Sequence, residues 1–232
     1  MGDPENVLHR ATDGRVGGVR LEEAHLPAAV LCALLVAAFV AQIALTFIGE
    51  GPERWALSWP QLRARRYETL FTHMFAHGGL LHLAGNLSAL LALAPPVALR
   101  LGTTLAGYGR FFILYLASGL AGGIAYLALR PAEEIGMVGA SGAICGLWGA
   151  FARTAGRGEA AVAAVFSAQV LRQTVAFAVS NLVLIALSLA ITGGLTGHPA
   201  VRIAWEGHLG GYMCGLAMVG LLARKIETKT LV

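Results

Sequence analysis

The sequence predicts an all-α, polytopic membrane protein, a bundle of six transmembrane helices. The chain has 232 residues, of which 56% are hydrophobic and only 13% are charged, whereas soluble domains carry about 25% charged residues. The charges are clustered and leave long uncharged runs; residues 26–49, for example, are 24 residues without Lys, Arg, Asp or Glu. About 20 apolar residues cross a bilayer, and six runs have roughly that length or more.

The six expected helices follow from these runs. They cover about residues 27–49, 79–99, 109–129, 141–153, 174–192 and 206–223, and a short interfacial helix is expected at 158–172. Residues 50–78 hold two Trp and one Tyr, residues that settle at the membrane interface, so we expect an ordered outer loop there. Segments 1–25 and 224–232 are expected as short tails around a membrane domain at 26–223.

The distribution of positive charge indicates the orientation. Eleven Lys and Arg residues fall on the side of the two termini and six on the opposite side. Cytoplasmic loops carry the excess of Lys and Arg, so both termini are expected in the cytoplasm. The first 25 residues show no cleavage site after a short apolar core, so the first helix is expected to stay as an anchor. A compact chain of this kind fits a bacterial inner membrane.

Several other classes of function are not indicated. The net charge is +4, but no basic helix or aromatic-interleaved patch indicates nucleic-acid binding. The three cysteines, Cys32, Cys145 and Cys214, are odd in number and form no CxxC, so neither a disulfide framework nor a thiolate metal site is expected. His73 and His77 have a zinc-like spacing, but the Glu of an HExxH motif and a third ligand are missing. We expect no metal.

Four polar residues are expected in one layer of the membrane. With a rise of about 1.5 Å per residue, counting to the arginine that ends each helix places Ser141, Asn86 and His208 about 18–24 Å from the inner boundary. In a hydrocarbon core about 30 Å thick, this is roughly 6–12 Å below the outer boundary. His82 lies one turn before Asn86. Polar groups at this depth are costly unless they face one another or water, so we expect a wet pocket open to the outside.

The residue types in this layer suit acyl transfer. A serine hydroxyl needs a base within hydrogen-bond reach, and histidine is the usual one. Glycines four apart let helices approach closely in lipid, and they occur at 142 and 146 on the serine helix and at 207, 211 and 215 on the histidine helix. The candidate oxyanion donors are the backbone N–H of Ser141 and the side chains of His82 and Asn86. No acidic residue lies in an uncharged span, so a Ser141–His208 dyad is expected.

Three motifs carry a family resemblance. Gly139-Ala140-Ser141-Gly142 resembles the GxSG motif of the rhomboid intramembrane serine proteases. Gly207-His208-Leu209-Gly210-Gly211 resembles their sixth-helix histidine motif, with Gly207 where Ala is common. His82-Leu83-Ala84-Gly85-Asn86 is similar to their second-helix HxxxN, and residues 72–77 resemble the stretch before it. The resemblance covers roughly residues 50–223, with the motifs in family order.

The resemblance implies a six-helix core and specific roles. Ser141 would be the nucleophile and His208 the base, with His82, Asn86 and the Ser141 N–H as oxyanion donors. The implied substrates are transmembrane segments of other proteins, cleaved near their outer end after entry from the bilayer, with no cofactor. The residues that would support the site are Gly139, Gly142, His77, Gly211 and Cys145.

Two positions depart from the family pattern. Glu68-Thr69 stands where the family's first loop often has Trp-Arg, which puts the anchoring of that loop in question. Cys145, four residues after Ser141, stands where the family often has an aromatic residue, which changes the packing beside His208.

Alternatives to a protease remain open on the sequence. Ser141 alone would be an ordinary helix-packing residue, and Cys145 could be a thiol nucleophile, although buried cysteines are usually inert. A non-catalytic rhomboid-like protein that binds transmembrane helices would usually lack Ser141 or His208. A small transporter or proton channel would be expected to show inverted repeats or broken helix pairs, and neither is found.

Overall fold

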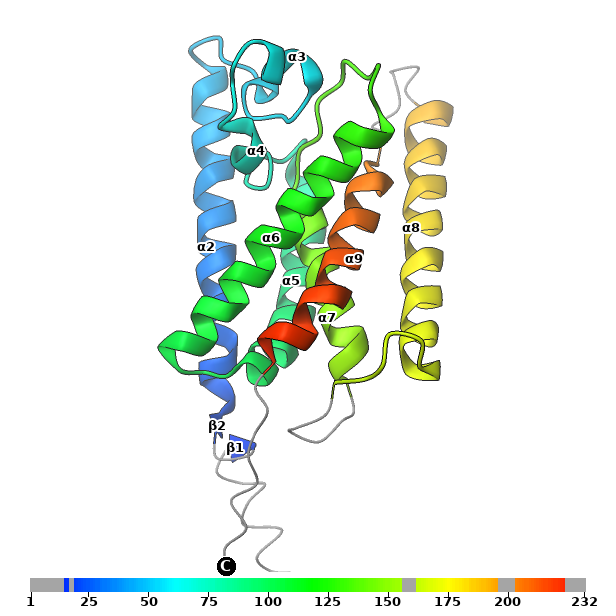
Figure 1. Ribbon diagram of the computed structural model, residues 1–232. Coiled ribbons are helices and arrows are strands. Elements are labelled where there is room, and N and C mark those ends of the chain that lie inside the picture. Colours follow the sequence, from blue (N-terminus) through cyan, green and yellow to red (C-terminus); the bar gives the residue numbers. More distant parts are fainter. Residues whose placement is uncertain (1–14, 17–18, 156–161, 196–202, 224–232) are drawn as a thin grey trace, which may run out of the picture.

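The computed structural model is a bundle of long helices with a small outer cap (Figure 1). It describes residues 15–16, 19–155, 162–195 and 203–223. The elements, in order, are β1 (Arg15–Val16), β2 (Val19–Arg20), α2 (Leu21–Thr46), η1 (Pro52–Arg54), α3 (Trp59–Arg63), α4 (Thr69–Thr72), α5 (Leu80–Leu101), α6 (Leu105–Leu129), α7 (Ser141–Thr154), α8 (Ala168–Leu195) and α9 (Trp205–Leu222). The all-α prediction is correct apart from the antiparallel pair of two-residue strands, β1 and β2.

All six expected helices form, but they differ in length. Within the described residues, α2, α5, α6 and α8 are long and apolar enough to cross a membrane. The other two are shorter, with 14 residues in α7 and 18 in α9, and a 14-residue helix is only about 21 Å long. The count of six spans therefore stays a prediction. The start of α2 and the end of α9 lie at the same end of the bundle (Figure 1).

The first helix begins earlier than expected. We predicted a polar tail up to residue 25, whereas α2 begins at Leu21 and runs through Pro27. Proline has no N–H, so the carbonyl four residues before it loses its helical partner. That carbonyl belongs to Glu23, and the Tyr108 hydroxyl of α6 donates to it over 2.9 Å. This tertiary bond lets the helix extend through the proline.

The separate interfacial helix is not found. Residues 162–167 form turns, and 168–172 are the first residues of α8. The expected start of that helix falls in 156–161, outside the described residues. The prediction was wrong for 162–172, because residues 162–167 are not helical and residues 168–172 belong to the first turns of α8.

The outer loop between α2 and α5 is tied to the bundle at several points. Leu57 pairs with Met137 through two backbone hydrogen bonds of 2.9 Å. The Trp59 indole N–H donates to the Leu127 carbonyl over 2.9 Å. On the other side, the Gln42 side chain of α2 donates to the His77 carbonyl over 2.8 Å and accepts from the His77 N–H over 3.0 Å. The loop therefore enters α5 in a fixed position.

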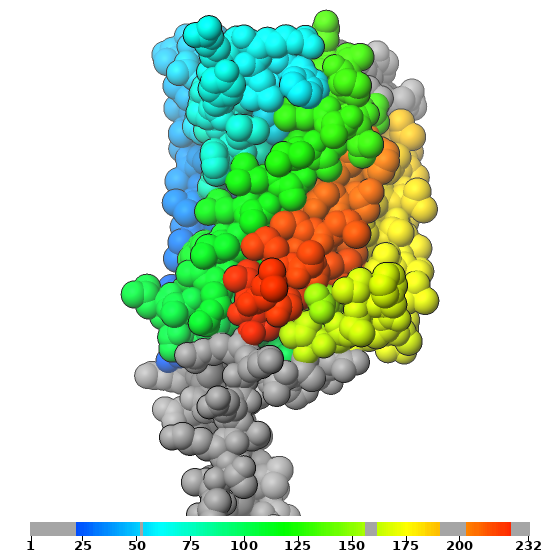
Figure 2. All heavy atoms as spheres, in the orientation of Figure 1, coloured from blue at the N-terminus to red at the C-terminus, as the bar shows by residue number. Residues whose placement is uncertain are grey.

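Glycines allow α7 and α9 to cross in direct backbone contact. A Cβ on Gly211 would overlap the Gly142 carbonyl, and one on Gly215 would overlap the Gly146 carbonyl. The space-filling view shows α9 lying between α6 and α8 (Figure 2). The opposed glycine faces expected from the sequence are thus where the two helices meet.

Gly211→Ala should destabilise the fold, because the new methyl group must push α9 away from α7. Overpacking of this kind costs about 1–3 kcal/mol. Gly85→Ala is the matched control, since Gly85 lies on α5 with open space around its Cβ position. Thermal unfolding in detergent should show a lower midpoint for Gly211→Ala only; equal midpoints for the two variants would contradict the packing described.

Two loop histidines should make stability depend on pH. Burial lowers the pKa of His73 to about 4; burial and then His82 lower the pKa of His77 to about 4. Between these values and the ordinary 6.5, the unfolded chain binds protons that the folded chain does not, so stability falls as pH falls through this window.

The expected result is a lower thermal midpoint at pH 5 than at pH 7.5. His73→Gln should make the difference smaller, because one of the two titrating rings is gone. A wild-type midpoint that does not change between these pH values would contradict the burial of both rings.

Candidate active site

Ser141 is the first residue of α7, and the chain reaches it through a strained turn. Gly139 has φ +125°, a conformation that favours glycine. Its N–H donates to the His73 carbonyl over 2.8 Å, which ties the turn to the outer loop. A Cβ on Gly139 would lie 2.8 Å from His82 Nε2 and 3.6 Å from Ser141 Oγ. The missing side chain therefore leaves the space into which both groups point.

The structure brings Ser141 and His208 into hydrogen-bond contact. Ser141 Oγ lies 2.8 Å from His208 Nε2. His208 is in the first turn of α9 and is buried. The approach depends on Gly142 and Gly211, at the crossing of the two helices. A serine within reach of a buried imidazole is the arrangement that nucleophilic catalysis needs.

A third polar residue contacts the imidazole, and the sequence analysis missed it. Asn181 Oδ1 on α8 lies 2.6 Å from His208 Nδ1. A dyad without a third group was expected because no Asp or Glu lies in the uncharged runs. The available signal was the amide of Asn181 well inside the uncharged run 173–201, because polar residues in a membrane helix are rarely without a function or a partner.

Side chains on the same face hold this part of α8 against the bundle. Gln173 Oε1 accepts from the Trp148 indole over 3.0 Å. The Thr174 and Tyr212 hydroxyls lie 2.8 Å apart. The Phe177 ring stacks on Tyr212 at 4.2 Å and meets Trp148 edge-on at 5.7 Å. These contacts bring Asn181, one turn further along, to His208.

The candidate oxyanion donors lie on α5. His82 Nδ1 accepts from the Gly78 N–H over 3.3 Å, which leaves the ring proton on Nε2, the nitrogen near Gly139. Asn86, one turn later, is buried, and its side-chain nitrogen has no hydrogen-bond partner among the described residues. A buried donor left unpaired is costly, so this amide is a good candidate to bind a ligand.

His77 and Cys145, the other predicted supporting residues with large enough side chains to pack, have packing roles rather than catalytic ones. The His77 ring packs edge-on against His82 with 5.1 Å between centroids, so it supports the position of His82. Cys145 is a free thiol packed against the cluster that includes Phe177 and Tyr212. That environment fits apolar packing better than a second nucleophile.

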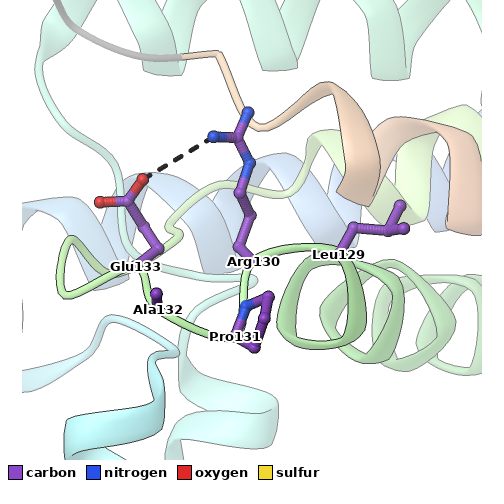
Figure 3. A pocket seen from close by; sticks show the side chains of 5 residues that line it. All are labelled: Leu129, Arg130, Pro131, Ala132 and Glu133. Carbon is purple, nitrogen blue, oxygen red and sulfur yellow. Dashed lines mark ion pairs between the residues drawn. The ribbon is translucent and has the colours of Figure 1, made fainter.

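An ion pair fixes the start of α9 near His208. The buried Glu206 carboxylate lies 2.5 Å from Arg130 Nε, at the end of α6. Arg130 also faces Glu133 at 3.9 Å in a pocket of about 260 Å³ (Figure 3), lined by Leu129, Arg130, Pro131, Ala132 and Glu133. Ser141 and His208 do not line this pocket, so it is distinct from the candidate active site.

No metal centre is evident in the part of the chain that the structure describes. Within it, no three His, Cys, Asp or Glu residues gather closely enough to hold an ion. The three described cysteines are free thiols.

Comparison with known proteins agrees with the motifs. A family model described as "Rhomboid domain" matches residues 64–225. One relative is a protein of Bacillus subtilis (strain 168) described as "Putative rhomboid protease YdcA", 35% identical over 82 residues. That match covers 35% of this chain and 38% of the relative, so the chain matches well under half of the relative's length. Together with four apolar helices long enough to span a bilayer, the family match indicates an integral membrane protein. The chain belongs to the rhomboid family.

Proposed function

We propose that the protein is an intramembrane serine endopeptidase that uses Ser141 as nucleophile and His208 as base. The observation that carries the proposal is the 2.8 Å contact between Ser141 Oγ and His208 Nε2, within a bundle whose longest helices can cross a membrane. The rhomboid family match and the name of the B. subtilis relative support the same class of reaction.

The reaction has two halves. Ser141 Oγ attacks the substrate carbonyl carbon while His208 Nε2 takes the hydroxyl proton. The resulting oxyanion accepts hydrogen bonds from the Ser141 N–H, His82 Nε2–H and Asn86 Nδ2–H. His208 then gives its proton to the leaving amine, and the C–N bond breaks. Water then attacks the acyl ester carbon while His208 Nε2 takes one of its protons. The ester C–O bond breaks, His208 returns that proton to Ser141 Oγ, and the acid product leaves.

The proposed substrates are membrane proteins with a cleavable bond in or near a transmembrane segment. By the rise per residue, Ser141 is expected about 12 Å below the outer boundary of the hydrocarbon core. This depth favours a bond near the outer end of the substrate helix. The proposed orientation has both termini in the cytoplasm, because the side of the termini carries the excess of Lys and Arg. The proposed location is a bacterial inner membrane.

The first test uses a fluorophosphonate probe on the purified protein in detergent. Wild type should be labelled at Ser141. Ser141→Ala should take no label there because its hydroxyl is gone, and His208→Ala should be labelled about 100- to 10,000-fold more slowly, because a serine hydroxyl without a base is a weak nucleophile. Ser88→Ala, on the exposed face of α5, is the control and should label like wild type. Mapping of the adduct by mass spectrometry identifies the residue. A folded wild type that takes no label would favour the non-catalytic helix-binding alternative.

Asn86→Leu should separate catalysis from stability. Loss of one oxyanion donor lowers kcat by about 100- to 1,000-fold. The donor has no partner among the described residues, so its removal should leave the thermal midpoint unchanged or higher. Turnover of a model transmembrane substrate and thermal unfolding would both be measured, with Ser88→Ala as control. A lower midpoint with unchanged kcat would mean that Asn86 is structural.

A further inference from the structure

We infer that Asn181 on α8 is a positioning residue that fixes the orientation and tautomer of the His208 imidazole. The inference rests on the proposed function and deepens it by adding a third member to the expected pair. It starts from the 2.6 Å contact between Asn181 Oδ1 and His208 Nδ1.

The amide has only one orientation that satisfies its neighbours. Its nitrogen donates to the Phe177 carbonyl over 2.9 Å, so the oxygen is the atom that faces the imidazole. A carbonyl oxygen can only accept, and therefore His208 Nδ1 must carry the ring proton. Nε2 is then left with its lone pair, 2.8 Å from Ser141 Oγ. This is the tautomer that a base for Ser141 needs.

The contact should strengthen as the reaction proceeds. When Nε2 takes the Ser141 proton, the imidazole becomes cationic, and the Nδ1–H···Oδ1 bond becomes charge-assisted. The bond is partly buried, and a hydrogen bond shielded from water is worth more than one in water. Asn181 does not touch the reacting atoms, so it acts through His208 rather than on the substrate.

Among the described residues, the His208 ring has two side-chain hydrogen-bond partners, Ser141 at Nε2 and Asn181 at Nδ1. Asn181 is itself held in place, because its amide nitrogen donates to the backbone carbonyl of Phe177, whose ring packs against Trp148 and Tyr212. The orientation of His208 therefore depends on the packing of α8.

A purely structural role explains less of the geometry. An asparagine in a lipid-facing helix can satisfy its amide nitrogen on the carbonyl four residues earlier, as Asn181 does with Phe177. That bond alone would leave Oδ1, in a half-buried side chain, without a donor from the protein. The short distance to His208 Nδ1 supplies the donor.

The test compares Asn181→Leu and Asn181→Ala, which remove the acceptor, with Asn181→Asp, which keeps it. Val183→Ala is the matched control, because Val183 is an exposed residue on the same part of α8. The measured quantities are the rate of fluorophosphonate labelling of Ser141, kcat and KM on a model transmembrane substrate, and the thermal midpoint. Two apolar variants are used so that misfolding of one does not remove the comparison.

Loss of one hydrogen bond to a charged group should lower the labelling rate and kcat by about 10- to 100-fold. KM should stay within about threefold of wild type, since Asn181 does not contact the substrate in this scheme. Asn181→Asp should restore kcat to within about threefold, because a carboxylate accepts the same hydrogen bond.

Two results would overturn the inference while leaving the protease proposal intact. One is labelling of Asn181→Leu and Asn181→Ala at the rate of Val183→Ala. The other is an Asn181→Asp variant as slow as Asn181→Leu although folded. A wild type without His208-dependent labelling would instead overturn the proposed function, and this inference with it.

Discussion

The site depends on the direct backbone contact between α7 and α9. Gly142 and Gly146 face Gly211 and Gly215 so closely that a methyl group at either α9 position would overlap a carbonyl of α7. In lipid, helices gain little from burying apolar side chains against each other, so close packing of small residues is a main source of association. Only at this separation can the short Ser141 side chain reach His208 Nε2.

The elements that carry the other site residues are attached to the bundle by different kinds of contact. The start of α9 is held to α6 by the buried Glu206–Arg130 pair, and the loop that enters α5 is held by the two hydrogen bonds between Gln42 and His77. In contrast, α8 is the least buried of the four helices that could cross a membrane. The contacts that hold it near the site are made by side chains, among them Gln173, Thr174 and Asn181.

Features that are set by residues close together in the chain could be predicted from the sequence, whereas contacts between distant residues could not. The serine turn, the spacing of His82 and Asn86 on one helix face, and the glycine rows are each set within a few residues. Gln42 and Asn181 act on residues 35 and 27 positions away, and no local pattern states their partners. The start of α2 was misjudged for the same reason, since the Tyr108 hydroxyl satisfies the Glu23 carbonyl from another helix.

The contact between Asn181 and His208 links the position of α8 to the geometry of the base. An amide and an imidazole N–H that separate in a low-dielectric interior each lose a partner, which costs about 1–3 kcal/mol per group. The packed position of α8 and the Nδ1–H tautomer of His208 therefore stabilise each other, by equal amounts in both directions. Asn181 would be unfavourable in a lipid-facing helix without a partner. Its contact with His208 removes that cost and holds α8 at the site.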